Sequence, residues 1–281
     1  AKEVGVAGSL AINIVNTLTE AKVGEDATVG AGTGALEVKA ASTTKSITQS
    51  KPADGGASGD VGVGASVAVN VADNDTLATI ASEASVSSAE DVSVSAVGTH
   101  FMETGAKGGS AGGTAVTPVV AISVALNDTV AEVQAGDEIA PSGDFTIEAV
   151  QEARTNTTAE GSAQATSAAV GASLGLTVAD DTVRASLVRD ADVGGSLLVS
   201  AKNVFLSNTT AKASAKGAAQ ESEGDTNTVQ SQSDDQVKEA DKRSGKAEGT
   251  TETPDTSTSD GAVSVAAAIG INLTDSTAQA Y

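Results

Sequence analysis

Large aliphatic residues alternate with small or polar residues in several similar stretches of this chain. The clearest stretch, residues 64–80, reads GASVAVNVADNDTLATI, and related stretches are centred on Ala11, Ala121, Gly175 and Gly270. Successive side chains of a β-strand point to opposite faces of a sheet, so strict alternation is typical of a strand with one buried face. The pattern predicts a repeated strand whose large aliphatic side chains face a core: Leu10/Ile12/Ile14, Val67/Val69/Val71, Val120/Ile122/Val124, Leu174/Leu176/Val178 and Ile269/Ile271/Leu273.

Two further strands are predicted in each repeat, separated by residues that favour turns. A short strand with small and branched residues facing inward follows the acidic positions: Thr19/Ala21/Val23, Thr76/Ala78/Ile80, Thr129/Ala131/Val133 and Val183/Ala185/Leu187. One apolar residue (Val29, Val86, Ile139, Val193) precedes the next strand: Leu36/Val38/Ala40, Val92/Val94/Ala96, Phe145/Ile147/Ala149 and Leu197/Val199/Ala201. The last third of each repeat is polar and rich in Ala, Gly and Thr, which fits either weak strands with Ala facing inward or exposed arches.

The stretches recur about every 54 residues, with a longer step before the last one. A repeat that cannot close a core alone is expected to stack on its neighbours. The predicted fold class is therefore all-β, a parallel β-helix (β-solenoid) with coils about 4.8 Å apart. Because roughly 20 to 30 residues complete one coil of such folds, two coils per repeat are expected. A string of small β-sandwich modules is the alternative, although each would be small for an independent core.

The whole chain is predicted to be one solenoid segment with repeats at residues 4–58, 59–113, 114–166, 167–260 and 261–281. The fourth repeat contains an insertion, residues 221–260, that is acidic and rich in Ser and Thr, with almost no large apolar side chains. Such a segment cannot bury enough surface to offset its ordering entropy, so a flexible loop is expected, with a short charged helix at residues 234–246 as the alternative. The chain starts and stops within a repeat, which suggests a piece of a longer protein.

Composition narrows the class of protein further. The chain has no Cys and no Trp, one Met, one Tyr and three Phe, so a thin core of small side chains is expected. An Asp in place of Val69 should unfold the local coils, because an unpaired charge would enter this core. The formal net charge of −21 argues against nucleic acid and anionic lipid as partners. No apolar run is long enough to span a membrane, and the lack of Cys fits an exported bacterial protein.

Acidic residues after the first strand are the best candidates for a ligand site: Asp73, Asp75, Asp128, Asp180 and Asp181. If these residues stack at one corner of a rod, their oxygens could coordinate Ca²⁺, which would be the only cofactor. Asp and Asn also favour turns by hydrogen bonding to their own backbone and by tolerating positive φ. We favour turns without a metal ion. A chelator should then change stability little.

Catalysis is not expected. Residues 171–175 match the G-x-S-x-G pattern of a nucleophile elbow, but Ser173 lies inside a predicted strand, at an outward-facing position. The only His, His100, lies in another repeat and is expected to be structural or exposed. A polysaccharide-cleaving β-helix enzyme would need aromatic sugar platforms, which this chain almost lacks.

The strings GVGASVAVNVADNDTLATI, EDVSVSA, VAISVALNDTVAEV and GDFTIEA resemble the repeats of very large bacterial surface proteins. These proteins are filamentous-haemagglutinin-like adhesins and leukotoxin-type or autotransporter passengers. The resemblance implies a right-handed parallel β-helix that acts as an extracellular structural stalk or adhesive segment, with an unknown host or cell-surface ligand. The alternative is a subunit of a self-assembling extracellular fibre or sheath, joined end to end through unpaired strand edges.

Overall fold

A computed structural model describes residues 3–53, 56–217, 255–259 and 263–281 of the chain. The described residues form β-strands joined by turns, and they contain no α-helix. The predicted all-β class is therefore confirmed. The strands are β1 (Val4–Val23), β2 (Thr28–Gly30), β3 (Leu36–Ser50), β4 (Ala57–Ile80), β5 (Ser85–Ser88), β6 (Val92–Val133), β7 (Phe145–Leu187), β8 (Leu197–Lys216), β9 (Asp255–Ser259) and β10 (Val263–Ala280).

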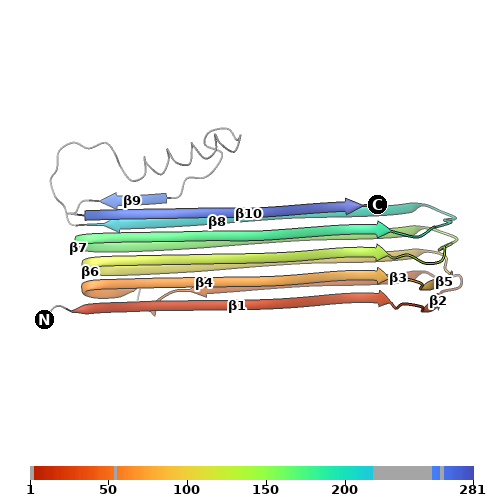
Figure 1. Ribbon diagram of the computed structural model, residues 1–281, viewed down its shortest axis with the longest axis horizontal. Helices are drawn as coiled ribbons and strands as arrows, with labels where there is room; N and C mark the ends of the chain where they lie inside the picture. The colour runs from red at the N-terminus through yellow and green to blue at the C-terminus, as the bar shows by residue number, and fades with distance from the viewer. Residues whose placement is uncertain (1–2, 54–55, 218–254, 260–262) are drawn as a thin grey trace, which may run out of the picture.

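The strands lie in two stacks, and all the described strand pairs are parallel (Figure 1). The front stack consists of β1, residues 61–80 of β4, residues 114–133 of β6, residues 168–187 of β7, and β10. The back stack consists of β3, residues 92–106 of β6, residues 145–164 of β7, and β8. The long strands β6 and β7 thus pass through both stacks and bend between them.

Equivalent residues of consecutive repeats are direct hydrogen-bonding neighbours. Ala11 pairs with Ala68, Ala68 with Ala121, Ala121 with Gly175, and Gly175 with Gly270. A second coil within each repeat would place other strands between these residues. The predicted two coils per repeat are therefore wrong, because a repeat passes once through each stack.

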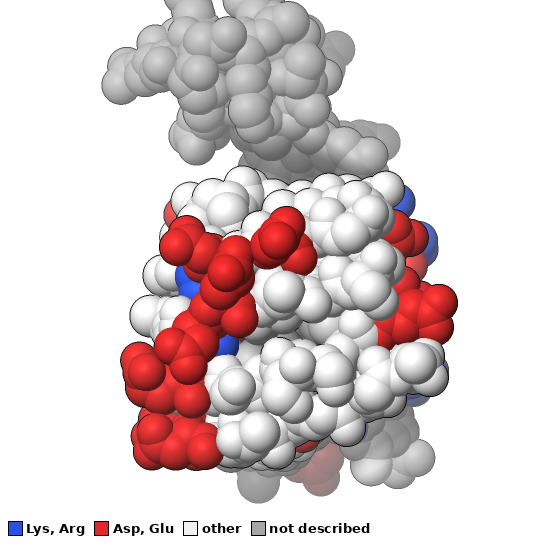
Figure 2. All heavy atoms as spheres, turned by 90° about the vertical axis from the view of Figure 1, so that its right-hand side faces the viewer, with Lys and Arg blue, Asp and Glu red and all other residues white. Residues whose placement is uncertain are grey.

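Short connections join the front stack to the back stack at the end of the molecule that carries β2 and β5. At this end, Asp91 accepts a hydrogen bond from the backbone N–H of Asp144, and Asp144 accepts one from that of Ser196, each at 2.8 Å. Asp and Glu side chains gather here in two groups (Figure 2). Some of the acidic residues therefore hold successive repeats in register.

The strand breaks expected at the acidic positions do not occur. β4 continues without interruption from Ala57 to Ile80, through Asp73 and Asp75. The polar last third of each repeat is also extended, and its Ala side chains, such as Ala106 and Ala159, are buried. Of the two structures considered for this part, the strand is confirmed and the exposed arch is wrong.

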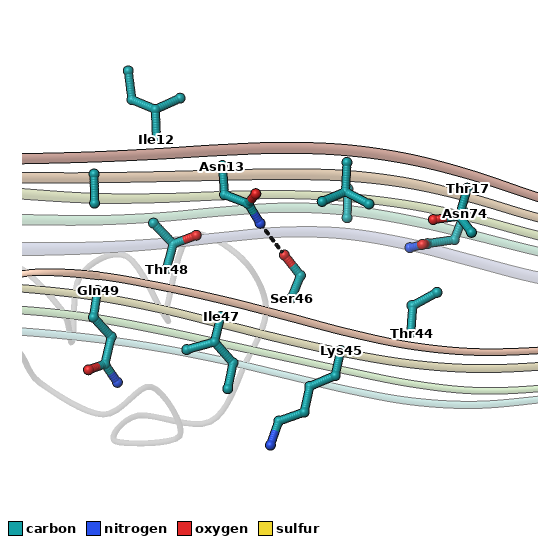
Figure 3. A pocket seen from close by; sticks show the side chains of 13 residues that line it. Ile12, Asn13, Thr17, Thr44, Lys45, Ser46, Ile47, Thr48, Gln49 and Asn74 are labelled. Atoms are coloured by element: carbon teal, nitrogen blue, oxygen red, sulfur yellow. Dashed lines mark hydrogen bonds between the residues drawn. The ribbon is translucent and has the colours of Figure 1, made fainter.

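The long aliphatic rows of the front stack point outward, opposite to the prediction. Ile12 and Ile14 are 60% and 74% exposed, whereas Ala68 and Ala121, at the alternate positions, are fully buried. Figure 3 shows Ile12 pointing away from the space between the stacks and Asn13 pointing into it. The prediction that these rows face the core is wrong, in the rows that begin with Leu10, Val67, Val120, Leu174 and Ile269.

Uninterrupted strands explain this reversal. In β4, Val69 and Val71 occupy odd positions, whereas Ala78 and Ile80 occupy even positions, so the two pairs must face opposite sides. Ala78 and Ile80 are fully buried, as predicted. A turn at Asp73 would have brought both rows to one face, but the strand passes straight through this residue.

The core between the stacks widens from one end of the strands to the other. Near β2 and β5 it contains large side chains, including Phe145 and Ile147, as predicted for that strand. At the opposite end, where β6 and β7 bend, it consists of Ala side chains. A Cβ atom on Gly64 would lie 1.8 Å from the carbonyl oxygen of Gly109, so the backbones there approach too closely for any side chain.

Most of the predicted insertion, residues 221–254 with the alternative helix at 234–246, lies outside the described residues. Its final part, Asp255–Ser259, forms β9, which pairs with the end of β8. This part is therefore a strand and not the predicted flexible loop.

Candidate functional site

Asn, Ser and Thr side chains line the middle of the space between the stacks. The Nδ2 of Asn13 donates a hydrogen bond to the Oγ of Ser46 at 2.8 Å (Figure 3). Ser46 in turn donates one to the Oδ1 of Asn70 at 2.7 Å. In the next layer, Ser123 donates a hydrogen bond to Thr104 at 2.7 Å. These bonds link the front stack to the back stack and satisfy polar groups that burial would otherwise destabilise. The sequence pattern did not predict this network, because it places the front-stack members Asn13, Asn70 and Ser123 on the outer face.

Asp181 lies at the centre of a second buried network. Its Oδ1 accepts hydrogen bonds from the Nδ2 of Asn127 at 2.7 Å and from the Nε2 of Gln151 at 2.8 Å. Asn127 also accepts a hydrogen bond from Asn74 at 2.8 Å. Burial of the side chain raises the pKa of Asp181 to about 6, with a smaller contribution from the neighbouring Asp180. A carboxylate is therefore held inside the protein, where its charged form is disfavoured.

The other predicted site residues lie on the opposite side of the front stack from Asp181. Asp73, Asp75, Asp128 and Asp180 occupy outward-facing positions, and Asp75 is in register with Asp128. Burial, followed by repulsion from neighbouring carboxylates, raises the pKa of Asp75 and of Asp128 above the ordinary value.

None of these acidic residues lies in a turn, so the turn interpretation is wrong. The structure brings Asp73, Asp75, Asp128 and Asp180 to one face and separates Asp181 from them. Within the described part of the chain, no group of three or more His, Asp or Glu residues is placed to hold a metal ion. A Ca²⁺ site that includes all of the predicted residues would need ligands on both sides of the sheet.

His100 and Ser173 are both buried and hydrogen-bonded. The Nδ1 of His100 lies 2.9 Å from the Oγ1 of Thr44, and burial lowers the pKa of His100 to about 4, so the imidazole is neutral at pH 7. The hydroxyl of Ser173 donates a hydrogen bond to the carbonyl of Lys212 at 2.6 Å. Ser173 therefore faces the inside of the protein, and its predicted outward position is wrong.

Arg189 binds three successive repeats together and was not singled out from the sequence. Its buried guanidinium donates hydrogen bonds to the carbonyls of Ala81, Ala84, Gln134 and Ala135. These carbonyls lie in the connections of two preceding repeats. Arg189 does not belong to a repeated sequence pattern, so the sequence contains no signal for this role.

The outward surface of the front stack is largely apolar. We call it the apolar front face, and define it as the outward-facing side chains of residues 4–14, 61–71, 114–124, 168–178 and 263–273. Its edge strands are the most exposed, with Leu10 at 67% and Ile269 at 55%. Asp73, Asp128 and Asp180 lie beyond it at one end of the strands.

The outward surface of the back stack carries charged side chains among exposed apolar ones such as Val204 and Leu206. Ion pairs join Lys107 to Glu160 at 2.8 Å and Arg154 to Glu152 at 3.2 Å. These charged residues distinguish the back face from the apolar front face, whose outward positions carry no charged residue.

The space between β1 and β3 opens to solvent at the first layer. The opening has a volume of about 490 Å³ and is lined by inward polar side chains that include Thr44, Ser46 and Asn74 (Figure 3). It exposes the polar interior at the point where a preceding layer would stack.

No protein-family model, no curated protein and no solved structure matches this chain. Among the described residues, there is no helix long and apolar enough to cross a membrane. The resemblance to giant surface proteins therefore stays a prediction from the sequence.

Proposed function

We propose that this chain is a non-catalytic structural or adhesive segment of a large secreted or cell-surface bacterial protein, and that its repeats wind into a parallel β-helix. The pairing of equivalent residues in consecutive repeats, such as Ala68 with Ala121, is the observation that supports this proposal most directly. Each added repeat extends such an arrangement by one layer without new architecture. The protein would then act through its shape and its surfaces.

Each layer of the fold is long in the direction of its strands and thin in the direction in which the layers stack. Adjacent strands lie about 4.8 Å apart, so each repeat adds only that much along the stacking direction. Across the stack, β1 alone has 20 residues, which corresponds to roughly 66 Å at about 3.3 Å per residue. We therefore propose a spacer with wide contact surfaces, in place of the slender stalk that two coils per repeat would give.

A subunit of an extracellular fibre or sheath is the second candidate. In the described part of the chain, β1 is hydrogen-bonded to a strand on one side only, and the polar interior opens beside it. Unpaired strand edges accept strands of another chain. In a longer protein, the same edge would accept the preceding layer of the same chain.

Insertion of three extra copies of residues 114–166 tests the β-helix. The extra copies should lengthen one axis by about 14 Å in small-angle X-ray scattering, with the other two dimensions unchanged. The circular dichroism per residue should also stay constant. An increase in the radius of gyration typical of separate linked modules would contradict the β-helix and support the sandwich alternative.

Antibodies raised against this chain test its location. They should label intact cells of the bacterium that makes the protein, or its culture medium. Labelling that requires permeabilised cells would contradict the proposed surface role. Fibres that lengthen with protein concentration in electron micrographs would favour the second candidate.

A further inference from the structure

The apolar front face is larger than the apolar patches of most soluble proteins. It covers roughly 800 Å², from about 3.3 Å per residue along each strand and about 4.8 Å between strands. The largest apolar patch of a typical monomer measures about 300–600 Å². Parallel sheets occur almost only with both faces covered, but the back stack covers just the inner face of the front stack. The outer face thus has the chemistry of a buried surface.

We propose that the apolar front face binds the same face of a second copy of this chain, with the strands of the two copies antiparallel. A specific interface of standard size buries about 800 Å² on each partner, which matches the area of this face. Two sheets packed in this way lie about 10 Å apart, as in a β-sandwich. The contact is closed and isologous, so assembly stops at the dimer.

Side-chain size along the strands supports the antiparallel arrangement. A row of small residues crosses the centre of the face, and a row of large residues lies next to it, two positions along each strand. A two-fold axis between the two rows places each large row over the partner's small row. With parallel strands, large residues would meet large residues and leave a gap between the small ones. The small row is Gly8, Ala65, Pro118, Ala172 and Ala267, and the large row is Leu10, Val67, Val120, Leu174 and Ile269.

The acidic residues favour the same arrangement. Asp73, Asp128 and Asp180 all lie at one end of the face. Parallel strands would bring these carboxylates opposite those of the partner, at about the 10 Å separation of packed sheets. Antiparallel strands place the two acidic rows at opposite ends of the dimer, where they repel each other least.

Other occupants of the face fit less well. Residues 218–254 include only two large apolar residues, Val229 and Val237, which is too few to cover it. A lipid surface is usually bound through Trp and Tyr together with basic residues, whereas this chain has no Trp, one Tyr and a net charge of −21.

Sedimentation of the 281-residue chain tests the dimer. We expect twice the monomer mass of 27.2 kDa at micromolar concentration, with no larger species. Because each substitution acts twice in an isologous contact, Ile122→Asp should raise the dimer dissociation constant at least about 100-fold. Val97→Asp is the matched control, since Val97 also lies in β6 and is half-buried on the outward side of the back stack, and it should leave the dimer intact. Circular dichroism should show that both variants are folded.

A nitroxide spin label tests the arrangement, because the chain has no Cys and a single Cys takes a unique label. With Asp128→Cys, just outside the face, the two labels should lie about 60 Å apart in the antiparallel dimer, from about 3.3 Å per residue. Pulsed electron paramagnetic resonance measures this distance. A separation below about 20 Å would indicate parallel strands and overturn the proposed arrangement.

Three results would overturn the dimer itself. They are a monomer at 100 µM, an oligomer that grows without limit, and a dimer whose dissociation constant is unchanged by Ile122→Asp. Flotation of the folded monomer with phosphatidylcholine vesicles, lost in Ile122→Asp, would assign the face to lipid. None of these results would affect the proposed β-helix, which the repeat insertion tests separately.

Discussion

Ala68 and Val69 are neighbours in β4, but Ala68 is fully buried between the stacks and Val69 lies on the outward side of the front stack. The inner positions of this strand are small or polar because the stacks lie close together near the bends, as Gly64 and Gly109 show. The polar residues among them, such as Asn70, are hydrogen-bonded across the gap. Thus a small residue marks the inside of this part of the protein, and a large aliphatic residue marks the outside.

Asp substitutions at these two neighbours test this assignment. Ala68→Asp should lower the free energy of unfolding by more than about 4 kcal/mol, because it buries an unpaired charge. Val69→Asp should cost only about 1 kcal/mol through lost cross-strand contacts, and the monomer should stay folded. Thermal melting measured by circular dichroism distinguishes the two. Equal losses would indicate that the inner and outer faces are assigned wrongly.

Asp181 and His100 give opposite contributions to the pH dependence of stability. The pKa of Asp181 in the folded protein is about 6, above its ordinary 3.8, so its contribution to stability falls as the pH rises from about 4 to 6. The pKa of His100 is about 4, below its ordinary 6.5, so its contribution falls as the pH drops through the same range. The two effects partly cancel in the natural chain.

Asp181→Asn isolates one of these contributions. The free energy of unfolding of the variant, relative to the natural chain, should rise by about 3 kcal/mol between pH 4 and pH 7, since one pKa unit corresponds to about 1.4 kcal/mol. Asn stands at the equivalent positions 74 and 127, so the change is compatible with the network. Asp180→Asn, which removes a carboxylate from the outward face of the same strand, is the control. Denaturant titrations at several pH values measure both.

Along the strands, some of the inner faces predicted from the sequence are correct and others are reversed. The inward rows of the back stack, such as Val92 and Phe145, could be predicted because they lie next to clear turns. The front rows could not, because the polar residues after Ile14 and Val71 predict a turn. Asp and Asn favour turns, but here the flanking β-branched residues and the neighbouring parallel strands keep the chain extended. A strand break predicted wrongly at these residues therefore assigns every side chain before it to the opposite face of the sheet.

The connections between the stacks depend on Arg189. Removal of its guanidinium in Arg189→Ala would leave four carbonyls without this donor, and should lower the free energy of unfolding by about 2–4 kcal/mol. Arg189→Lys should cost less, because an ammonium group reaches some of these carbonyls. Chemical denaturation measures the free energies of unfolding of the natural chain, Arg189→Lys and Arg189→Ala, which should decrease in this order. Equal stability of all three would show that Arg189 does not hold the connections together.

For the whole molecule, the sequence predicted the all-β class, because alternation is a local property of the chain. The number of coils per repeat was wrong because it was predicted from the roughly 20 to 30 residues of an ordinary coil, whereas a single front strand here already takes 20 residues. Because side chains alternate along a strand, Asp181 lies on the inner face of the front stack. Asp73, Asp75, Asp128 and Asp180 lie together on the outer face. Interactions between residues far apart along the chain, such as those of Arg189 with Ala81 and Ala84, have no local signal in the sequence.

The pairing of β10 does not require a long connection to β8. Replacement of residues 218–254 by a Gly/Ser linker of about ten residues should leave the melting temperature and the circular dichroism of the strands unchanged. Such a linker spans about 17 Å, enough to join Gly217 to Asp255, because Asp255 pairs with Lys212. A clear drop in melting temperature would show that the removed residues stabilise the stacks.

The pairing of β10 has a practical consequence. Gly270 pairs with Gly175 in the same register in which Gly175 pairs with Ala121, although many more residues separate the first pair along the chain. The described front strands therefore stay aligned although the lengths of chain between them differ greatly. An epitope or enzyme grafted in place of residues 218–254 would be held next to a known pair of strands, β8 and β10.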